Sequence, residues 1–331
     1  MKLIVGDVGG TNARLALAEW QGDRLQLSEP RIYASGGEPD FAPILARFIG
    51  EARADGVAAA IIGIAGPVRD NRCATTNLPW QLDGAALAAA LSLPRVQLLN
   101  DLEAAAWGID QVAAGQRRVL QPGQSEPRGN RAVIAAGTGL GEAGLVWCER
   151  GYRPFASEGS HADFAPGDAD QVALRDWLAD RYGGHVSWER VVSGPGLADL
   201  YRYQREQGGA GCEPDPLAAT DVAAAVAAGA QDDPVCAAAL DLFIQLFGAE
   251  AGNLALKLMA SGGVYLAGGI APKLAERLAG GAFMTAFRDK GRMAGLLAIM
   301  PVTLLIDPHL ALKGAAVYGA RSLQDGTDDP T

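Results

Sequence analysis

The order of apolar and polar positions in the first 110 residues predicts alternating strands and helices. Helical spacing predicts helices at 44–56 and 82–92. Apolar or alternating runs predict strands at 3–7, 13–20, 59–66 and 95–100. Helices between strands indicate parallel pairing, and the first two strands, which only a short turn separates, indicate an antiparallel hairpin. This part of the chain is therefore predicted to be an α/β domain.

A second strand, glycine turn and strand follow at 131–147, after a polar and turn-rich passage. This unit resembles the hairpin at the N-terminus, and the repeat suggests two related domains. Beyond residue 170 the pattern is mainly helical. It predicts a loop at 205–216, a strand at 262–270, a frayed tail at 325–331, and helices at 173–183, 223–230, 235–260 and 272–278.

Length and composition are those of a globular protein with two cores. The chain has 331 residues, of which 49% are hydrophobic. A net charge of -10 argues against binding to nucleic acid. The four cysteines show no metal-ligand or disulfide spacing, so we expect a reduced, cytoplasmic protein. The N-terminus resembles no signal peptide, and no apolar run is long enough to predict membrane insertion.

The first glycine turn lies in GDVGGT, residues 6–11. Neither the Rossmann nor the P-loop pattern fits, because the glycines lead into a second strand rather than a helix. Gly9 and Gly10 suit a hairpin turn that needs positive φ. Glycines also let backbone N–H groups approach phosphate oxygens, and Thr11 can add a hydroxyl. Asp7 beside a phosphate would require a cation, for which Mg²⁺ is the natural candidate.

A second glycine turn, with Gly137, Thr138 and Gly139, has the same two interpretations. Two such turns, each with a threonine, favour a nucleotide site more than either alone. Asn100 and Asp101 follow a predicted strand and begin a helix. One of them can cap that helix, which leaves the other as a possible base for a substrate hydroxyl.

Glu158 and His161 lie in a segment of small residues, EGSHADFAP, and could bind a neutral polyhydroxyl ligand. By its pattern alone, Glu189 is interpreted as a solvated helix residue, and His185 and His309 as structural. The segment 266–274 with Gly268 and Gly269 predicts either a plain strand-to-helix turn or a glycine ledge for an adenosine.

The motifs GDVGGTNARLAL, IAGPV, LNDLEAAAWG, AGTGLGEAGL, EGSHADFAP, ERVVSGPGL and LAGGIAPK resemble, in order and spacing, the bacterial glucokinases of the actin, hexokinase and chaperone ATPase superfamily. The resemblance implies a two-domain ribonuclease H-like, actin-like ATPase fold with an active-site cleft between the domains. We expect a small domain over 1–110, completed by a helix over 308–325, and a large domain over 111–307.

The resemblance also implies residue roles. Asp101 is the general base for the 6-hydroxyl of glucose, and Asn100, Glu158, His161 and Glu189 bind the sugar with it. The ATP-binding residues would be Gly6, Asp7, Val8, Gly9, Gly10, Thr11, Gly137, Thr138, Gly139, Gly268 and Gly269. Asp7 would bind Mg²⁺, through water, and a homodimer is expected.

Two other functions stay open at this point. The enzyme could phosphorylate another hexose, such as mannose or an amino sugar. An actin-like ATPase switch shares the phosphate turns, but it has no use for the sugar-binding set. The zinc motif of the related ROK (repressor, open reading frame, kinase) sugar kinases has no counterpart in the sequence.

Overall fold

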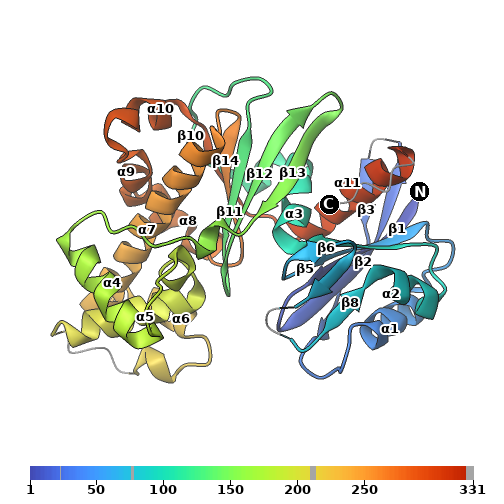
Figure 1. Cartoon of the computed structure of the whole chain (residues 1–331), viewed down its shortest axis with the longest axis horizontal. Coiled ribbons are helices and arrows are strands. Elements are labelled where there is room, and N and C mark those ends of the chain that lie inside the picture. The colour runs from blue at the N-terminus through green and yellow to red at the C-terminus, as the bar shows by residue number, and fades with distance from the viewer. Residues whose placement is uncertain (23, 76–77, 209–213, 326–331) are drawn as a thin grey trace. The chain divides into compact units, whose positions relative to one another are not determined.

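The computed structural model describes residues 1–331 except 23, 76–77, 209–213 and 326–331. Part of the predicted loop at 205–216 and nearly all of the predicted tail lie outside the described residues. The chain forms two compact units, which Figure 1 shows in colour from the N-terminus to the C-terminus. The first consists of residues 1–114, 150–156 and 307–331, and the second of residues 115–149 and 157–306.

The first unit is built on a sheet with the strand order β3-β2-β1-β5-β9, in which β4 also pairs with β2. The β1–β2 pair is antiparallel, whereas β1, β5 and β9 run parallel, as the sequence predicts. A small sheet, β6-β7-β8, lies beside it. The strands are β1 (Lys2–Val8), β2 (Asn12–Gln21), β3 (Arg24–Leu27), β4 (Arg31–Ala34), β5 (Ala59–Ile64), β6 (Val68–Arg69), β7 (Arg72–Ala74), β8 (Gln81–Asp83), β9 (Val96–Asn100) and, for most of its length, β13 (Gly151–Ser157).

Helices cover both faces of this sheet. The helices and 3-10 turns are α1 (Ala42–Ala52), α2 (Gly84–Leu91), α3 (Asp101–Trp107), η1 (Ile109–Gln111), η2 (Ala114–Gln116) at the border with the second unit, and α11 (Leu310–Asp325). α1 ends four residues before the predicted end because Arg53 adopts a left-handed conformation, with φ of 47°, and closes the helix.

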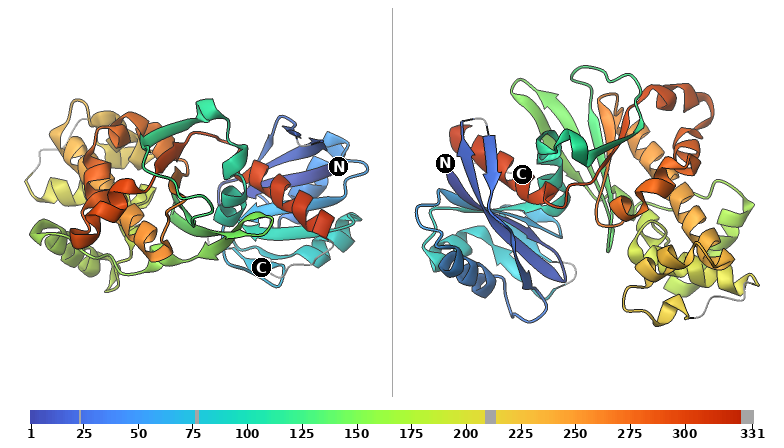
Figure 2. Two further views of the ribbon diagram at one scale, coloured as in Figure 1. Left: turned by 90° about the horizontal axis from the view of Figure 1, so that it is seen from above. Right: turned by 180° about the vertical axis from the view of Figure 1, so that it is seen from behind.

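Alternation along β1 explains the two covered faces. Ile4 and Val8 belong to the cluster that includes α1 and α2, while Leu3 and Val5 belong to the cluster that includes α3 and α11. Figure 2 shows α11, the last helix of the chain, lying along strands from the start of the chain. The C-terminal helix is therefore part of the first unit's core.

The second unit repeats this plan with the strand order β10-β15-β14-β11-β12. The β11–β12 pair is the antiparallel hairpin, and β11, β14 and β15 run parallel. The strands are β10 (Arg117–Gln121), β11 (Arg131–Ala136), β12 (Leu140–Cys148), β14 (Gly263–Ala267) and β15 (Val302–Leu305). The two units thus share one arrangement in which a glycine turn joins the two strands of the antiparallel hairpin.

The helices of the second unit contribute most of its core. They and the 3-10 turns are η3 (Gly159–His161), α4 (Ala169–Tyr182), η4 (Trp188–Arg190), α5 (Gly194–Glu206), η5 (Pro216–Ala218), α6 (Val222–Gly229), α7 (Pro234–Leu258), η6 (Ala271–Leu274), α8 (Ala275–Ala279), α9 (Ala282–Arg288), η7 (Gly291–Met293) and α10 (Ala294–Ile299). Among the described helices, α7 is long and apolar enough to cross a membrane by composition. Because 67% of its apolar window is buried within the structure, we assign α7 to the core.

Candidate active site

The first glycine turn joins β1 to β2. The amide of Gly9 donates to the carbonyl of Asn12 at 3.0 Å, and Ser35 holds the turn by hydrogen bonds to Gly9 and Thr11. The expectation that Gly9 has positive φ is wrong. A Cβ added at Gly9 would make only ordinary contact with described atoms, with the oxygen of Asn12 at 3.7 Å. The described part of the chain therefore does not require a glycine at this position.

Gly6 and Val8 lie in β1 rather than in the turn. A Cβ at Gly6 would lie 2.8 Å from Ile62 and 2.9 Å from Leu15, so close packing explains this glycine. The side chain of Val8 is buried in the core of the first unit. Gly6 can take part in binding only through its backbone groups.

Asp7 points to the face of the sheet that α3 and α11 cover, because it follows Leu3 and Val5 at a spacing of two. It stands opposite Gly63 of β5 in the parallel pairing. Burial raises the pKa of its carboxyl, and Arg14 beside it lowers the pKa by a smaller amount. The Arg14 Nη1 to Asp7 Oδ2 distance is 3.4 Å, so the ion pair is a weak one. A divalent cation would offset the remaining charge.

Asn100 caps α3. Its side-chain oxygen accepts from the amides of Leu102 and Glu103, at 3.0 and 3.2 Å, and its Nδ2 donates to the carbonyl of Gly66 at 3.2 Å. Of the two predicted interpretations of this pair, the structural one therefore applies to Asn100. Asp101 also accepts from Leu102, but its carboxylate is not needed as the cap.

Glycines set the position of α3 and hence of Asp101. A Cβ at Gly63 would lie 3.0 Å from the Cβ of Ala104 and 3.7 Å from the Cα of Asp101. On the opposite side, a Cβ at Gly314 of α11 would lie 1.6 Å from the carbonyl oxygen of Ala104. α3 is thus packed directly between β5 and α11, and at each contact the neighbouring element has a glycine, Gly63 in β5 and Gly314 in α11.

Cys73 lies close to Asp101. Burial raises the pKa of its thiol to about 11, and the negative charge of Asp101 adds to the effect. The thiol is therefore protonated at neutral pH. It belongs to β7, in the small sheet beside the carboxyl ends of β1 and β5.

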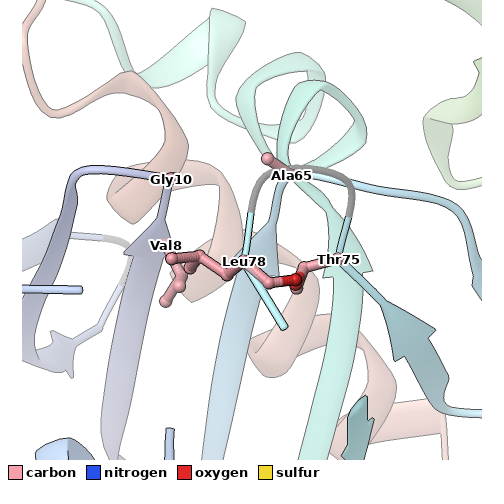
Figure 3. A pocket seen from close by; sticks show the side chains of 6 residues that line it. Val8, Gly10, Ala65, Thr75 and Leu78 are labelled. Carbon is pink, nitrogen blue, oxygen red and sulfur yellow. The ribbon is translucent and has the colours of Figure 1, made fainter. Parts of the chain in front are cut away.

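A small hollow adjoins the first glycine turn (Figure 3). Its lining is Val8, Gly9, Gly10, Ala65, Thr75 and Leu78. The Thr75 hydroxyl donates to the carbonyl of Leu78 at 2.7 Å. None of these lining residues carries a charged side chain.

The second glycine turn is tied to Glu189. The amide of Leu140 donates to Glu189 Oε2 at 3.0 Å, and a Cβ at Gly139 would lie 2.5 Å from the same oxygen. The pattern-based interpretation of Glu189 as a solvated helix residue is wrong, because the residue lies in the 3-10 turn η4 and its carboxylate binds this turn. Gly137, by contrast, has no described atom within 4 Å of an added Cβ and no positive φ.

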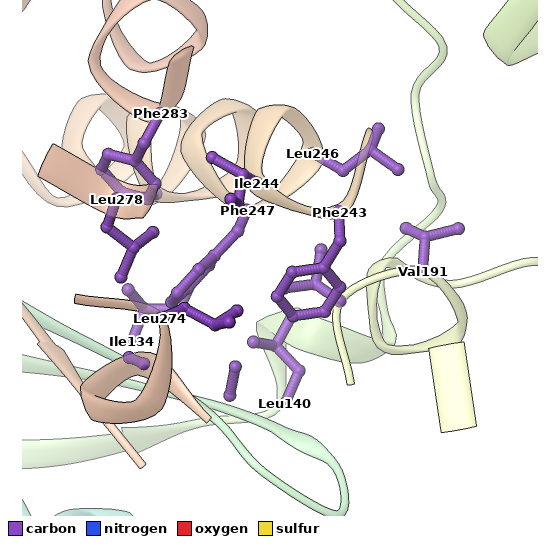
Figure 4. Close-up of a cluster of buried hydrophobic side chains, with 14 of the residues drawn as sticks. Ile134, Leu140, Val191, Phe243, Ile244, Leu246, Phe247, Leu274, Leu278 and Phe283 are labelled. Carbon is purple, nitrogen blue, oxygen red and sulfur yellow. The ribbon is translucent and has the colours of Figure 1, made fainter. Parts of the chain in front are cut away.

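Core side chains hold both partners of this contact. Leu140 directly follows Gly139, and Val191 is two residues from Glu189. Both side chains point into the hydrophobic cluster around Phe243 and Phe247 of α7 (Figure 4). The second turn is therefore attached to a rigid part of its unit.

His161 is the last residue of the 3-10 turn η3, and Glu158 directly precedes this turn. His161 Nε2 is 3.8 Å from Glu158 Oε2, and both side chains are more than half exposed. The structure thus brings these two predicted residues together. His185, interpreted as structural, pairs with Asp163 at 2.9 Å.

Gly268 and Gly269 follow β14. Gly268 has φ of 88°, and a Cβ there would lie 2.4 Å from the carbonyl oxygen of Ala136, so its own backbone requires a glycine. Gly269 has open space around its Cα within the described residues. The open positions Gly9, Gly137 and Gly269 are all glycines that the described chain does not demand, and they are therefore candidates for close approach of a ligand.

Sequence reasoning did not identify two residues that matter to these sites. Gly63 lies within a buried apolar strand, and only its contact with α3 reveals its role. Glu142, a fully buried carboxyl in β12, lies within one of the quoted motifs. A charged residue at an inward-facing position of a strand was the available signal.

The first unit thus offers a base, a glycine turn and an acidic residue suited to a cation, and the second offers another glycine turn with carboxyl and imidazole groups. Two backbone anion sites together with neutral hydrogen-bonding groups suit a phosphorylated nucleotide and a polyhydroxyl acceptor.

Comparison with known proteins agrees with this chemistry. The family model described as Glucokinase matches residues 4–322. A glucokinase from Synechocystis sp. is 40% identical, with 97% of this chain and 99% of the relative covered.

Solved structures share the fold. A glucokinase from an Antarctic psychrotroph has a TM-score of 0.83 at 29% identity, covering 97% of this chain and 99% of that one. A ROK-family glucokinase from Streptomyces griseus, solved with glucose and AMPPNP, has a TM-score of 0.64 at 22% identity, covering 96% of this chain and 98% of that one. The fold is the two-domain actin-like ATPase fold. The chain belongs to the glucokinase family, whose enzymes phosphorylate glucose with ATP as the phosphoryl donor.

Proposed function

We propose that this enzyme transfers the γ-phosphoryl group of ATP to the 6-hydroxyl of glucose, with Asp101 as the general base, giving glucose 6-phosphate and ADP. The observation that carries the assignment is that Asn100 and Asp101 take different positions at the start of α3. The side chain of Asn100 accepts from the amides of Leu102 and Glu103 as the cap of α3, and Asp101 is the first residue of this helix, where its carboxylate can act on a substrate hydroxyl. A sugar hydroxyl is a poor acid, and a positioned base contributes about 10²- to 10⁴-fold to the rate.

Phosphate binding is assigned to the two glycine turns. The amides of Gly9 and Gly137 are used within the two turns, on Asn12 and Gly139, and the backbone N–H groups of Gly10, Thr11, Thr138 and Gly139 can donate to phosphate oxygens. The open surroundings of Gly9 and Gly137 support this assignment. Phosphoryl transfer depends mainly on positioning and charge neutralisation, which such donors supply.

Asp7 is the residue proposed to hold Mg²⁺, through water. Its partial burial and its weak ion pair with Arg14 fit a carboxylate that gains from a cation. Bound Mg²⁺ would neutralise charge on the transferring phosphate. One carboxylate together with substrate phosphates is a usual Mg²⁺ environment.

Glucose is proposed to be bound by Asn100, Asp101, Glu158, His161 and Glu189. Asn100 uses one N–H on Gly66, and a second N–H remains for a sugar oxygen. Glu189 binds Leu140 through Oε2, and its Oε1 can accept from a hydroxyl. The exposed pair Glu158 and His161 supplies further acceptors and donors.

The adenosine is assigned to the glycine ledge. The open position of Gly269 allows a flat base to approach the backbone. We also propose a cytoplasmic homodimer. Cys73 and Cys148 are in no disulfide, which supports a reducing compartment. Sedimentation equilibrium that gives the mass of a single chain would contradict the dimer.

The deciding experiment measures ADP release with a panel of hexoses. Glucose should be the best acceptor and should stimulate ADP release strongly above the rate with ATP alone. A higher kcat/KM with mannose or an amino sugar would reassign the substrate. Hydrolysis that is independent of sugar would favour an actin-like ATPase switch instead.

A further inference from the structure

Glu142 is a fully buried carboxyl that has no role in the proposed phosphoryl transfer. It lies in β12 opposite Ile134 of β11, so its side chain points to the face where Ile134 packs in the core of the second unit. Its exposed fraction is 1%. Among the described residues, no donor reaches either of its carboxyl oxygens. An ionised carboxylate in this position would be both dehydrated and unpaired, which is strongly unfavourable.

Glu250 of α7 lies next to Glu142 and has the donors that Glu142 lacks. Asn253 Nδ2 donates to Glu250 Oε2 at 2.7 Å, and Lys257 Nζ donates to Oε1 at 3.3 Å. Lys290 is a further charged group near Glu250, and Asp289 lies near Lys290. Because the donors converge on Glu250, this residue holds the negative charge and Glu142 holds a proton. Burial and the charge of Glu250 raise the pKa of Glu142 to about 8, in agreement with this distribution.

The segment 157–161 folds over the Glu142 carboxyl. A Cβ added at Gly159 would lie only 2.3 Å from Glu142 Oε2, so the backbone of Gly159 rests directly on that oxygen. The Gly159 amide donates to the hydroxyl of Ser157 at 3.0 Å, which keeps the segment compact. Glu158 and His161, the titratable groups of this segment, are exposed on its other side.

We propose that Glu142 is a positioning residue for glucose, a protonated carboxyl that donates its hydrogen to the Glu250 carboxylate and so supports the segment that carries Glu158 and His161. The inference rests on the glucose-binding roles proposed above for these two residues. Loss of the proton places a second negative charge beside Glu250 under Gly159. Repulsion between the carboxylates then displaces the segment, and glucose binds less well.

The test compares the pH dependence of KM for glucose in wild type, Glu142→Gln and Glu149→Gln. Glu142→Gln mimics the protonated form, and Glu149→Gln makes the same charge change at an exposed position. At one pH unit above the pKa only about a tenth of the molecules keep the proton, so KM of the wild type should rise about tenfold. The kcat at saturating glucose should not change in parallel with KM over this pH range.

Glu142→Gln should have the wild-type KM at pH 7 and no alkaline rise, whereas Glu149→Gln should follow the wild type. An alkaline rise that persists in Glu142→Gln, or no rise in the wild type, would overturn the proposal. Infrared spectroscopy gives a readout independent of sugar. Burial raises the pKa of Glu103 to about 7, so this carboxyl contributes to the carbonyl band of protonated carboxyls as well. The band should be present at pH 7 and weaker in Glu142→Gln by the intensity of one carboxyl; equal bands in the wild type and Glu142→Gln would overturn the protonation of Glu142.

A parallel variant separates this proposal from the assigned glucose site. Glu158→Ala should raise KM for glucose at pH 7. A wild-type KM in Glu158→Ala would overturn the sugar-binding role and, with it, the positioning role of Glu142. The infrared band would still decide whether Glu142 carries the proton.

Discussion

Replacing Gly63 with alanine should move the catalytic base without altering any group that touches substrate. The new Cβ would lie 3.0 Å from the Cβ of Ala104 and 3.4 Å from the carbonyl oxygen of Gly6. Carbon atoms in contact prefer about 3.5–4.0 Å, so α3 must shift outward by roughly 0.5–1 Å. Such overpacking costs about 1–3 kcal/mol of stability. A displacement of this size at the base can lower kcat by up to about 10²-fold.

The matched control is Gly50→Ala in α1 of the same unit. Gly50 has no described atom within 4 Å of an added Cβ and no positive φ, so alanine there should leave kcat unchanged and stabilise the helix slightly. Coupled ADP-release kinetics give kcat and KM, and thermal unfolding gives the stability change. A Gly63→Ala enzyme with the kcat of Gly50→Ala would refute the claim that glycine packing positions Asp101.

Three further predictions concern single groups. Asp7→Ala should raise the Mg²⁺ concentration needed for half-maximal activity by at least about tenfold, a loss of ~1.4 kcal/mol, without lowering the melting temperature; an unchanged Mg²⁺ dependence would exclude Asp7. Gly137→Ala should raise KM for ATP without destabilising the fold, because no described atom obstructs the new methyl group; unchanged ATP kinetics would remove this turn from the nucleotide site. Glu142 has a folded-state pKa of about 8, above its ordinary value of 4.5, so the folded protein keeps a proton that the unfolded chain loses between these pH values. The unfolding free energy of the wild type should therefore fall relative to Glu142→Gln by up to about 1.4 kcal/mol per pH unit in this window, and denaturant titrations showing no such divergence would contradict it.

Local patterns predicted much of the architecture. The hairpins, the parallel strands and the glycine turns follow from apolar spacing and glycine positions, which report on neighbours along the chain. The cap at Asn100 was also foreseeable, because a cap involves residues two and three positions away.

Tertiary contacts decided the rest. The pattern could not show that position 63 has a glycine because α3 lies against it. Nor could it show that the carboxylate of Glu189 binds a turn some 50 residues earlier. The expected positive φ at Gly9 followed from a general rule for hairpins, which this turn does not obey. Residues 150–156 count with the first unit, and the sequence offered no boundary around them.

The central claim is that Asp101 removes the proton from the 6-hydroxyl of glucose. Asp101→Asn keeps the size and polarity of the side chain but cannot act as a base at neutral pH. The most direct measurement is the rate of phosphoryl transfer in a single turnover, together with glucose affinity by calorimetry and with Asp55→Asn as an exposed control. We predict a rate lower by about 10²- to 10⁴-fold, with glucose affinity largely retained. A transfer rate close to that of Asp55→Asn would contradict the account.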